Sequence, residues 1–174
     1  GYYLDNKLWM LNAPGEWFHN KNDNKLYIWL TDSSNPNDHL IEVSHHNYGV
    51  SASSKGYVTI DDLDIRKASM YGVKFENSPG FIATNLDVSD SVNSGIFISS
   101  SNNGTVQNNL VKNSVREGVS VRNSDAISVI ANKVENSGTV GSPKNSLAGI
   151  HMNSISNHAL INNNTVLNSG YIGI

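Results

Sequence analysis

The sequence predicts an all-β protein: a right-handed parallel β-helix of about five coils of about 23 residues each, preceded by a β-hairpin segment. Three observations predict this fold. Gly followed by a branched apolar residue recurs at a nearly fixed interval, and two other ladders of apolar residues share that interval. Within each repeat, apolar and polar residues alternate, which is typical of strands. The segments between are rich in Asn, Ser, Gly and Asp, which favour turns.

The first 48 residues are predicted to be a hairpin that caps the helix. Residues 16–19 and 26–30 alternate or run apolar, and the polar turn 20–24 separates them. All three tryptophans of the chain lie in this segment: Trp9, Trp17 and Trp29. We expect them to form a small core that docks against one side of the helix. The alternative is that one of them is a platform on which a sugar stacks.

Residues 49–174 carry the repeat. The Gly ladder consists of Gly49-Val50, Gly72-Val73, Gly95-Ile96, Gly118-Val119, Gly149-Ile150 and Gly173-Ile174, with steps of 23, 23, 23, 31 and 24 residues. The apolar ladders are Ile60, Ala83, Val106, Val129 and Ile161, and Ile65, Val88, Val111, Val134 and Val166. A single repeat cannot bury its apolar residues, but coils stacked about 4.8 Å apart can. Left-handed β-helices use roughly 18 residues per coil, built from hexapeptides, so the longer period favours the right-handed form.

The pattern is unfinished at the last residue. We therefore expect the helix to be truncated at its C-terminal end, with further coils of a longer chain or a partner covering the open edge.

The chain contains 26 Asn, 24 Ser and 14 Gly in 174 residues, a composition often found in disordered chains. Two ladders explain the Asn content instead. They are Leu63, Leu86, Asn109, Asn132 and Asn164, and Lys67, Asp90, Asn113, Asn136 and Asn168. Stacked Asn amides can bond along the axis of the coils, and Asn tolerates the left-handed backbone of sharp corners. We assign none of these residues to chemistry.

Composition also excludes several classes. The net charge is −3 and only 16% of residues are charged, which argues against a nucleic-acid partner. Without cysteine there is no disulfide, no thiolate nucleophile and no zinc–thiolate site. No apolar run approaches the roughly 18 residues of a membrane span.

Outward residues of the strand after each Gly form an unusual mixture. One row is Ser51, Lys74, Phe97, Ser120 and His151; the next is Ser53, Glu76, Ser99, Arg122 and Asn153. The position before each Gly reads Tyr48, Tyr71, Ser94, Glu117 and Ala148, with Arg116 beside it. Tyr48 above Tyr71 predicts a flat apolar strip suited to a sugar ring. The insertion 139–146 is expected to stand beside this face as a wall. The alternative is an ordinary mixed polar surface.

We assign candidate roles on this face. The predicted catalytic residues are Glu117, Arg122 and His151. The predicted substrate-binding residues are Tyr48, Tyr71, Lys74, Phe97, Arg116 and Asn153. Elimination from a uronic acid needs a base and cations that stabilise the developing enolate. Hydrolysis needs two carboxylates, and Glu76 is two coils from Glu117, which leaves a partner for Glu117 beyond the last coil as the hydrolase alternative.

A second outward row contains Asp64 and Asp87, one coil apart and about 5 Å from each other. Retaining glycosidases space their carboxylates in this way, and calcium also favours such pairs. Arg66 and Lys67 are close enough to neutralise both. We expect ordinary surface charge here, with Asp64 and Asp87 as weak candidates for a metal site, and no cofactor apart from this calcium alternative.

The run Val106-x-x-Asn109-x-Val111-x-Asn113-Ser114, followed by Gly118-Val119-x-Val121, resembles the repeat of the right-handed parallel β-helix, pectate-lyase-like superfamily. The resemblance covers about residues 49–174. The opening segment, residues 14–18 and 25–29, resembles a hairpin insert of bacterial carbohydrate-active β-helix proteins. The resemblance implies a substrate cleft along the Gly-led strand, walled by turns. Lyases, hydrolases, epimerases, phage tailspikes and adhesins all share this fold, so it does not give the activity.

We therefore predict a protein that binds and cleaves a polysaccharide, as a lyase or glycoside hydrolase, outside the cell, on its surface or in the periplasm. The alternative is a non-catalytic surface protein, adhesin or polysaccharide-binding module, which predicts monotonous polar rows. The mixed row of Lys74, Phe97 and His151 favours the first.

Overall fold

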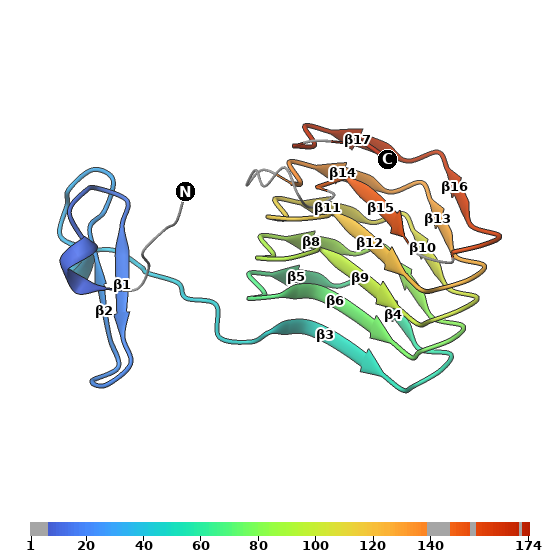
Figure 1. Ribbon diagram of the computed structural model, residues 1–174, viewed down its shortest axis with the longest axis horizontal. Coiled ribbons are helices and arrows are strands. Elements are labelled where there is room, and N and C mark those ends of the chain that lie inside the picture. The colour runs from blue at the N-terminus through green and yellow to red at the C-terminus, as the bar shows by residue number, and fades with distance from the viewer. Residues whose placement is uncertain (1–6, 139–146, 154–155, 171) are drawn as a thin grey trace. The chain divides into compact units, whose positions relative to one another are not determined.

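The computed structural model describes residues 7–138, 147–153, 156–170 and 172–174. The chain forms two compact units, Gly1–Val43 and Ser44–Ile174, the second of which contains the coils (Figure 1). The predicted boundary after residue 48 lies close to this division. In the described part of the chain, no helix is long and apolar enough to cross a membrane.

The first unit contains the expected hairpin. Strands β1 (Trp17–Asn20) and β2 (Lys25–Ile28) pair antiparallel, with Trp17 opposite Ile28. The short 3₁₀ helices η1 (Leu8–Met10) and η2 (Pro36–Asp38) flank it. The three tryptophans are exposed, so this unit does not bury them in a core of its own. Docking of the hairpin against the helix, and a sugar platform among these residues, stay predictions.

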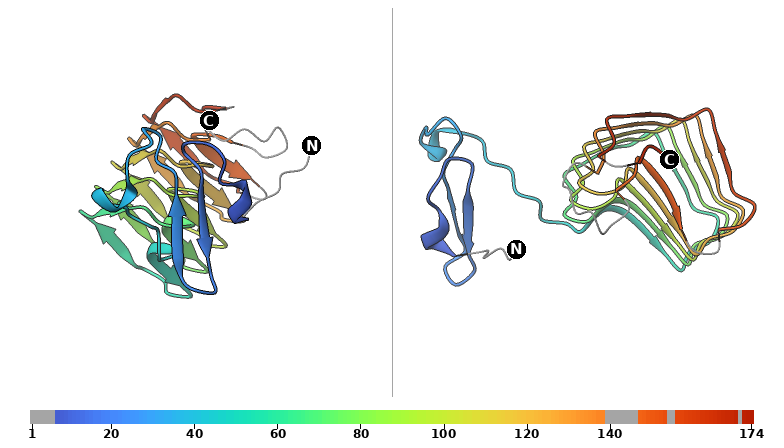
Figure 2. Two further views of the ribbon diagram at one scale, coloured as in Figure 1. Left: turned by 90° about the vertical axis from the view of Figure 1, so that its left-hand side faces the viewer. Right: turned by 45° about the horizontal axis from the view of Figure 1, so that its top comes forward.

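Within its described residues, the second unit has fifteen strands in three parallel sheets of five, with one strand per coil in each sheet. Figures 1 and 2 show how the coils stack. The first sheet contains β3 (Tyr48–Ser53), β6 (Tyr71–Glu76), β9 (Ile96–Ser99), β12 (Val119–Arg122) and β15 (Ile150–Asn153). The second contains β4 (Thr59–Asp61), β7 (Ile82–Thr84), β10 (Thr105–Gln107), β13 (Ser128–Ile130) and β16 (Leu160–Asn162). The third contains β5 (Asp64–Arg66), β8 (Asp87–Ser89), β11 (Leu110–Lys112), β14 (Lys133–Glu135) and β17 (Thr165–Leu167).

The strand registers confirm all three ladders. Val50 pairs with Val73 in the first sheet, Ile60 with Ala83 in the second, and Ile65 with Val88 in the third. The longer step in each ladder is absorbed between the fourth and fifth coils, where Val129 still pairs with Ile161. The ladder side chains line the inside of the coils, and most are completely buried.

The Gly ladder is required by close approach between sheets. A Cβ built on Gly118 would collide with Val134 Cγ1 in the third sheet and lie 2.7 Å from the carbonyl oxygen of Gly149 in the next coil. Gly173, at the end of the chain, has nothing within 4 Å of such a Cβ. The Gly residues therefore let the chain at the start of each strand of the first sheet lie directly against the third sheet.

The Asn ladders are also confirmed. The Asn132 Oδ1 atom accepts hydrogen bonds from Asn109 N at 3.0 Å and Asn109 Nδ2 at 2.8 Å, inside the coils. The second ladder, on the outside, has left-handed backbone throughout, with φ of 52° to 58°. A Ser ladder was not predicted: Ser78 N donates to Ser101 Oγ at 2.9 Å, and Ser101 N donates to Ser124 Oγ at 3.0 Å.

The last coil is continued by the end of the chain. Ala148 forms a parallel bridge with Ile172, and Gly149 N donates to Ile172 O at 3.0 Å. β15, β16 and β17 are the last strands of their sheets. That further coils or a partner cover this edge stays a prediction.

Candidate functional site

The first face, meaning the outward side of the first sheet, contains a buried carboxylate. Glu117 precedes Gly118 at the entrance to β12, and its side chain is only 1% exposed. Ser94 occupies the same row one coil earlier, and its Oγ donates a hydrogen bond to Glu117 Oε2 at 3.0 Å. Burying a carboxylate is costly unless hydrogen bonds and opposite charges compensate it.

Two arginines and a histidine surround this carboxylate. Arg122 Nη2 lies 3.6 Å from Glu117 Oε1, and Arg116 Nε lies 3.9 Å from Glu117 Oε2. His151 Nδ1 lies 4.0 Å from Glu117 Oε1. The structure thus brings the three predicted catalytic residues to one point, from the turn before β12, the end of β12 and the middle of β15. The catalytic roles themselves stay a prediction.

An aromatic column leads along the axis of the coils to Arg122. Tyr48 and Tyr71 are parallel within 4°, with ring centroids 6.0 Å apart, and Tyr71 stacks on Phe97 at 4.2 Å. The Arg122 guanidinium carbon lies 5.3 Å from the Phe97 ring centroid, and Arg122 Nε donates to Ser120 Oγ at 3.3 Å. The rings face one another, so they present less flat surface than the predicted strip. Phe97 is 7% exposed, which leaves a ligand little of it to contact.

Lys74 and Glu76 form a separate pair at the other end of the column. Lys74 Nζ donates to Glu76 Oε2 at 2.8 Å and lies 5.0 Å from the Tyr48 ring centroid. The hydrogen bond to Glu76 raises the pKa of Lys74, and burial raises the pKa of Tyr71. Lys74 is therefore charged and Tyr71 neutral at physiological pH. Glu76 has its own cation.

The face has a positive balance in a chain that is negative overall. Lys74, Arg116 and Arg122 face two carboxylates, Glu76 and Glu117, while the chain carries −3. The side chains of Arg116 and Arg122 are each 35% exposed and that of His151 is 19% exposed. These three side chains can reach a ligand, whereas Glu117 has almost no surface to offer one.

The other predictions for this face differ in outcome. Asn153 is exposed and pairs with Arg122 across β12 and β15. The predicted wall at 139–146 lies outside the described residues. Ser94 and Ser120 were missed as site residues. The signal for Ser94 was its place 23 residues before Glu117 in the same row; Ser120 similarly precedes Arg122 by two residues on one strand.

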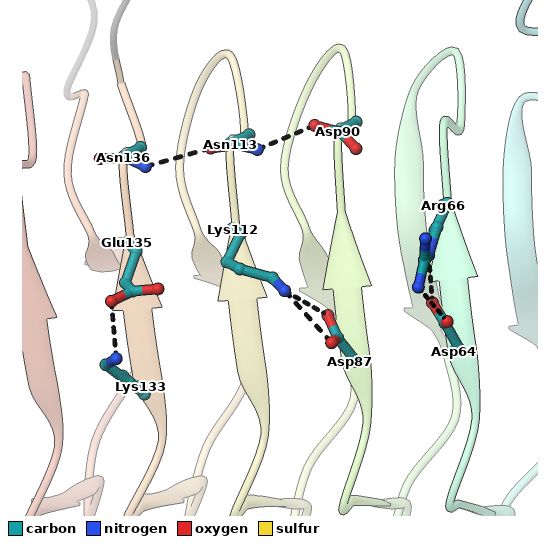
Figure 3. Close-up of polar contacts among 9 residues, drawn as sticks. All are labelled: Asp64, Arg66, Asp87, Asp90, Lys112, Asn113, Lys133, Glu135 and Asn136. Carbon is teal, nitrogen blue, oxygen red and sulfur yellow. Dashed lines mark hydrogen bonds and ion pairs between the residues drawn. The ribbon is translucent and has the colours of Figure 1, made fainter. Parts of the chain in front are cut away.

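The third face, the outward side of the third sheet, contains the aspartates Asp64 and Asp87, which are neighbours in register (Figure 3). Arg66 Nε donates to Asp64 Oδ1 at 2.7 Å, which confirms the predicted neutralisation by Arg66. This hydrogen bond lowers the pKa of Asp64. The cation at Asp87 is Lys112, with Nζ 3.2 Å from the carboxylate, a partner that the sequence analysis missed. Lys133 and Glu135 form a third pair (Figure 3).

Metal binding finds no further support on the third face. Within the described ranges, no group of three or more His, Asp or Glu side chains is placed to hold a metal ion. Asp64 and Asp87 as calcium ligands or as a catalytic pair stay predictions.

Comparison with known proteins addresses the fold. The family described as the right-handed β-helix region matches residues 19–166. Tailspike protein 2 of Escherichia coli O157:H7 bacteriophage CAB120 is similar in structure, with a TM-score of 0.45 and 17% sequence identity over 67% of this chain. The match spans only 20% of the tailspike chain. No curated protein sequence matches. Because the family match extends over most of the chain and the coils form three parallel sheets, this chain belongs to the right-handed β-helix family.

Proposed function

We propose that the protein binds an anionic polysaccharide along the first face. The observation that carries this proposal is the group of Arg116, Arg122 and His151 around one buried carboxylate, at the end of an aromatic column. Guanidinium groups are well suited to carboxylate ligands, because their N–H groups match the two oxygens. The partly exposed edges of Tyr48 and Tyr71 offer apolar contact to neighbouring sugar units.

Cleavage of the bound chain by elimination is the second part of the proposal. His151, whose side chain is 19% exposed, can accept the proton from the carbon beside the uronate carboxylate, and the two arginines beside it can stabilise the resulting enolate. The enolate electrons then form the double bond as the bond to the leaving sugar oxygen breaks, and that oxygen takes a proton from water. Glu117 is too enclosed to protonate a leaving group, so these residues favour elimination over hydrolysis. Since polysaccharides of this kind are met outside cells, we place the protein in an extracellular, cell-surface or periplasmic setting.

A panel experiment tests binding. Wild-type protein is titrated with uronic-acid polysaccharides and with their carboxyl-reduced, neutral counterparts, and binding is followed by gel retardation. We expect retardation by a carboxylated polysaccharide and none by its reduced form. The double variant Arg116→Ala/Arg122→Ala should lose binding, whereas Arg66→Ala, on the third face, should keep it. Equal binding of both polymers, or binding that survives the double variant, would contradict the proposal.

The same incubations test cleavage. Ultraviolet absorbance of unsaturated uronate ends reports elimination, and a reducing-end assay reports both reactions. We expect unsaturated ends with wild type and none with His151→Ala. Reducing ends without unsaturated ends would show hydrolysis. Binding with neither signal would establish the non-catalytic alternative.

A further inference from the structure

We propose that Glu117 is a positioning residue whose buried carboxylate holds Arg116 and Arg122 in place, so that their remaining N–H groups are set to receive one anionic group of the ligand. Glu117 then takes no part as an acid, base or nucleophile. The nature of the ligand rests on the proposed function, whereas the positioning of the two arginines does not.

Each carboxylate oxygen of Glu117 faces a different set of neighbouring side chains. Oε2 accepts the Ser94 hydrogen bond and faces Arg116, and Oε1 faces Arg122 and His151. With 1% of the side chain exposed, these neighbours enclose the carboxylate. A group enclosed on this scale can fix what surrounds it, but it cannot contact a substrate.

Arg122 is held from three directions. Its guanidinium faces Glu117, lies over the Phe97 ring and donates through Nε to Ser120 Oγ. Phe97 is in turn packed on Tyr71. An arginine ordered before binding loses less conformational entropy when a ligand arrives, which strengthens binding without any new contact.

The charge of Arg116 and Arg122 indicates which kind of ligand they can bind. Among the described residues, Arg116 and Arg122 share one carboxylate, so one positive charge is left without a partner there, and each side chain is still 35% exposed. Arg66, on the third face, has Asp64 for itself. An anionic group bound between Arg116 and Arg122 would compensate their remaining positive charge, as Asp64 compensates the charge of Arg66.

The test uses a feature of composition: the chain has only three arginines, Arg66, Arg116 and Arg122. Nuclear magnetic resonance of the arginine Nε–Hε groups therefore reports each one separately. In the free wild-type protein we expect rigid, slowly exchanging signals from Arg116 and Arg122. Glu117→Gln keeps the size of the side chain and an acceptor for Ser94, but removes the charge. We expect it to mobilise both signals and leave the Arg66 signal unchanged.

The second readout is the affinity of the protein for a polysaccharide. Polygalacturonate is the first probe, and if it does not bind, the panel member that binds best replaces it. Glu117→Gln makes the face more positive, so simple attraction predicts tighter binding of a polyanion. Positioning predicts the opposite, an affinity about tenfold weaker. Ser94→Ala, which removes one hydrogen bond and keeps every charge, should show a smaller change in the same direction. It also serves as the readout if circular dichroism shows that Glu117→Gln does not fold.

Each outcome decides the matter. Unchanged arginine signals in a folded Glu117→Gln protein, or tighter binding by it, would overturn the proposal. Loss of product formation at unchanged affinity would also overturn it, because Glu117 would then act in the chemistry. If wild type binds no polysaccharide of the panel, the proposed function fails, and the arginine signals still test positioning by themselves.

Discussion

The first and third faces contain similar charged residues at the same coil spacing, yet pair them differently. On the third face Asp64 pairs with Arg66, and Asp87 pairs with Lys112. On the first face Glu117 is shared by two arginines and a histidine. The third-face pair is open to water, with 62% of Arg66 and 52% of Asp64 exposed, whereas Glu117 is 1% exposed.

The two arrangements differ in strength because Glu117 is buried and the third-face pair of Arg66 and Asp64 is exposed. In water, paired charges are screened and contribute little, so the third face reads as a solvated surface. Charges that face a buried carboxylate interact in a lower dielectric and keep a fixed geometry. We therefore propose that the first face holds its charges in place for a ligand and that the third face, with the same residue types, does not.

The largest expected effect comes from breaking the corner that joins the two faces. Gly118→Ala places a methyl group against Val134 of the third sheet and the backbone of the next coil. We expect it to lower the free energy of unfolding by about 3 kcal/mol or more, measured by urea denaturation. Gly173→Ala, which meets nothing within 4 Å, is the matched control and should change stability little. Equal losses in the two variants would mean that close approach is not the reason for the Gly ladder.

The second largest expected effect on stability comes from removing the carboxylate of Glu117, and removal of Asp64 on the third face is the comparison. Glu117→Ala leaves two cations without their shared partner and opens a cavity, so we expect a loss of about 2 kcal/mol in unfolding free energy. Asp64→Ala should change little, because its pair is exposed. Thermal and urea unfolding of both variants make the comparison. Similar losses of unfolding free energy in the two variants would contradict the claim that burial makes Glu117 more important to stability than Asp64.

Exchanging arginine for lysine tests geometry at constant charge. Arg122→Lys loses the planar guanidinium that stacks on Phe97 and faces Glu117, and we expect about tenfold weaker binding of the acidic polysaccharide. Arg66→Lys should bind as wild type does. Isothermal titration calorimetry measures both. Full affinity in Arg122→Lys would show that charge alone suffices.

The smallest expected effect is a pH dependence on the third face. The pKa of Asp64 is lowered by its hydrogen bond with Arg66, so the ionised form stabilises the fold. This contribution is present above the ordinary pKa of Asp and is lost as pH falls through the lowered value. Asp64→Asn should therefore be slightly less stable than wild type at pH 7 and match it in strong acid. A difference that grows on acidification would have the wrong sign.

Sequence periodicity predicted the fold because every coil repeats the same burial pattern. Val73, Val88 and Ala83 could be placed in three sheets from spacing alone, since residues in register in stacked coils share one environment. The Asn ladders followed for the same reason. The Ser ladder escaped notice because Ser is common throughout the chain, and a short hydroxyl gives no periodic signal of its own.

The site was only partly predictable. Rows placed Glu117, Arg122 and His151 on neighbouring coils, but the contacts of Arg116 and Arg122 with Glu117 depend on the rotamers of long side chains. The stacking of Tyr71 on Phe97 is likewise a matter of side-chain rotamers, which period does not specify. Lys112 reaches Asp87 from the next coil, two residues beyond Leu110, which is the residue opposite Asp87, and register alone would not select that pair.

Titration of the wild-type protein with an acidic polysaccharide, followed through the three arginine Nε–Hε signals, tests the central claim most directly. We propose that the ligand binds on the first face, at the two arginines that share Glu117. The signals of Arg116 and Arg122 should therefore shift together as the ligand is added, while that of Arg66 stays in place. A shift of Arg66 equal to theirs, or binding that moves neither Arg116 nor Arg122, would contradict the account.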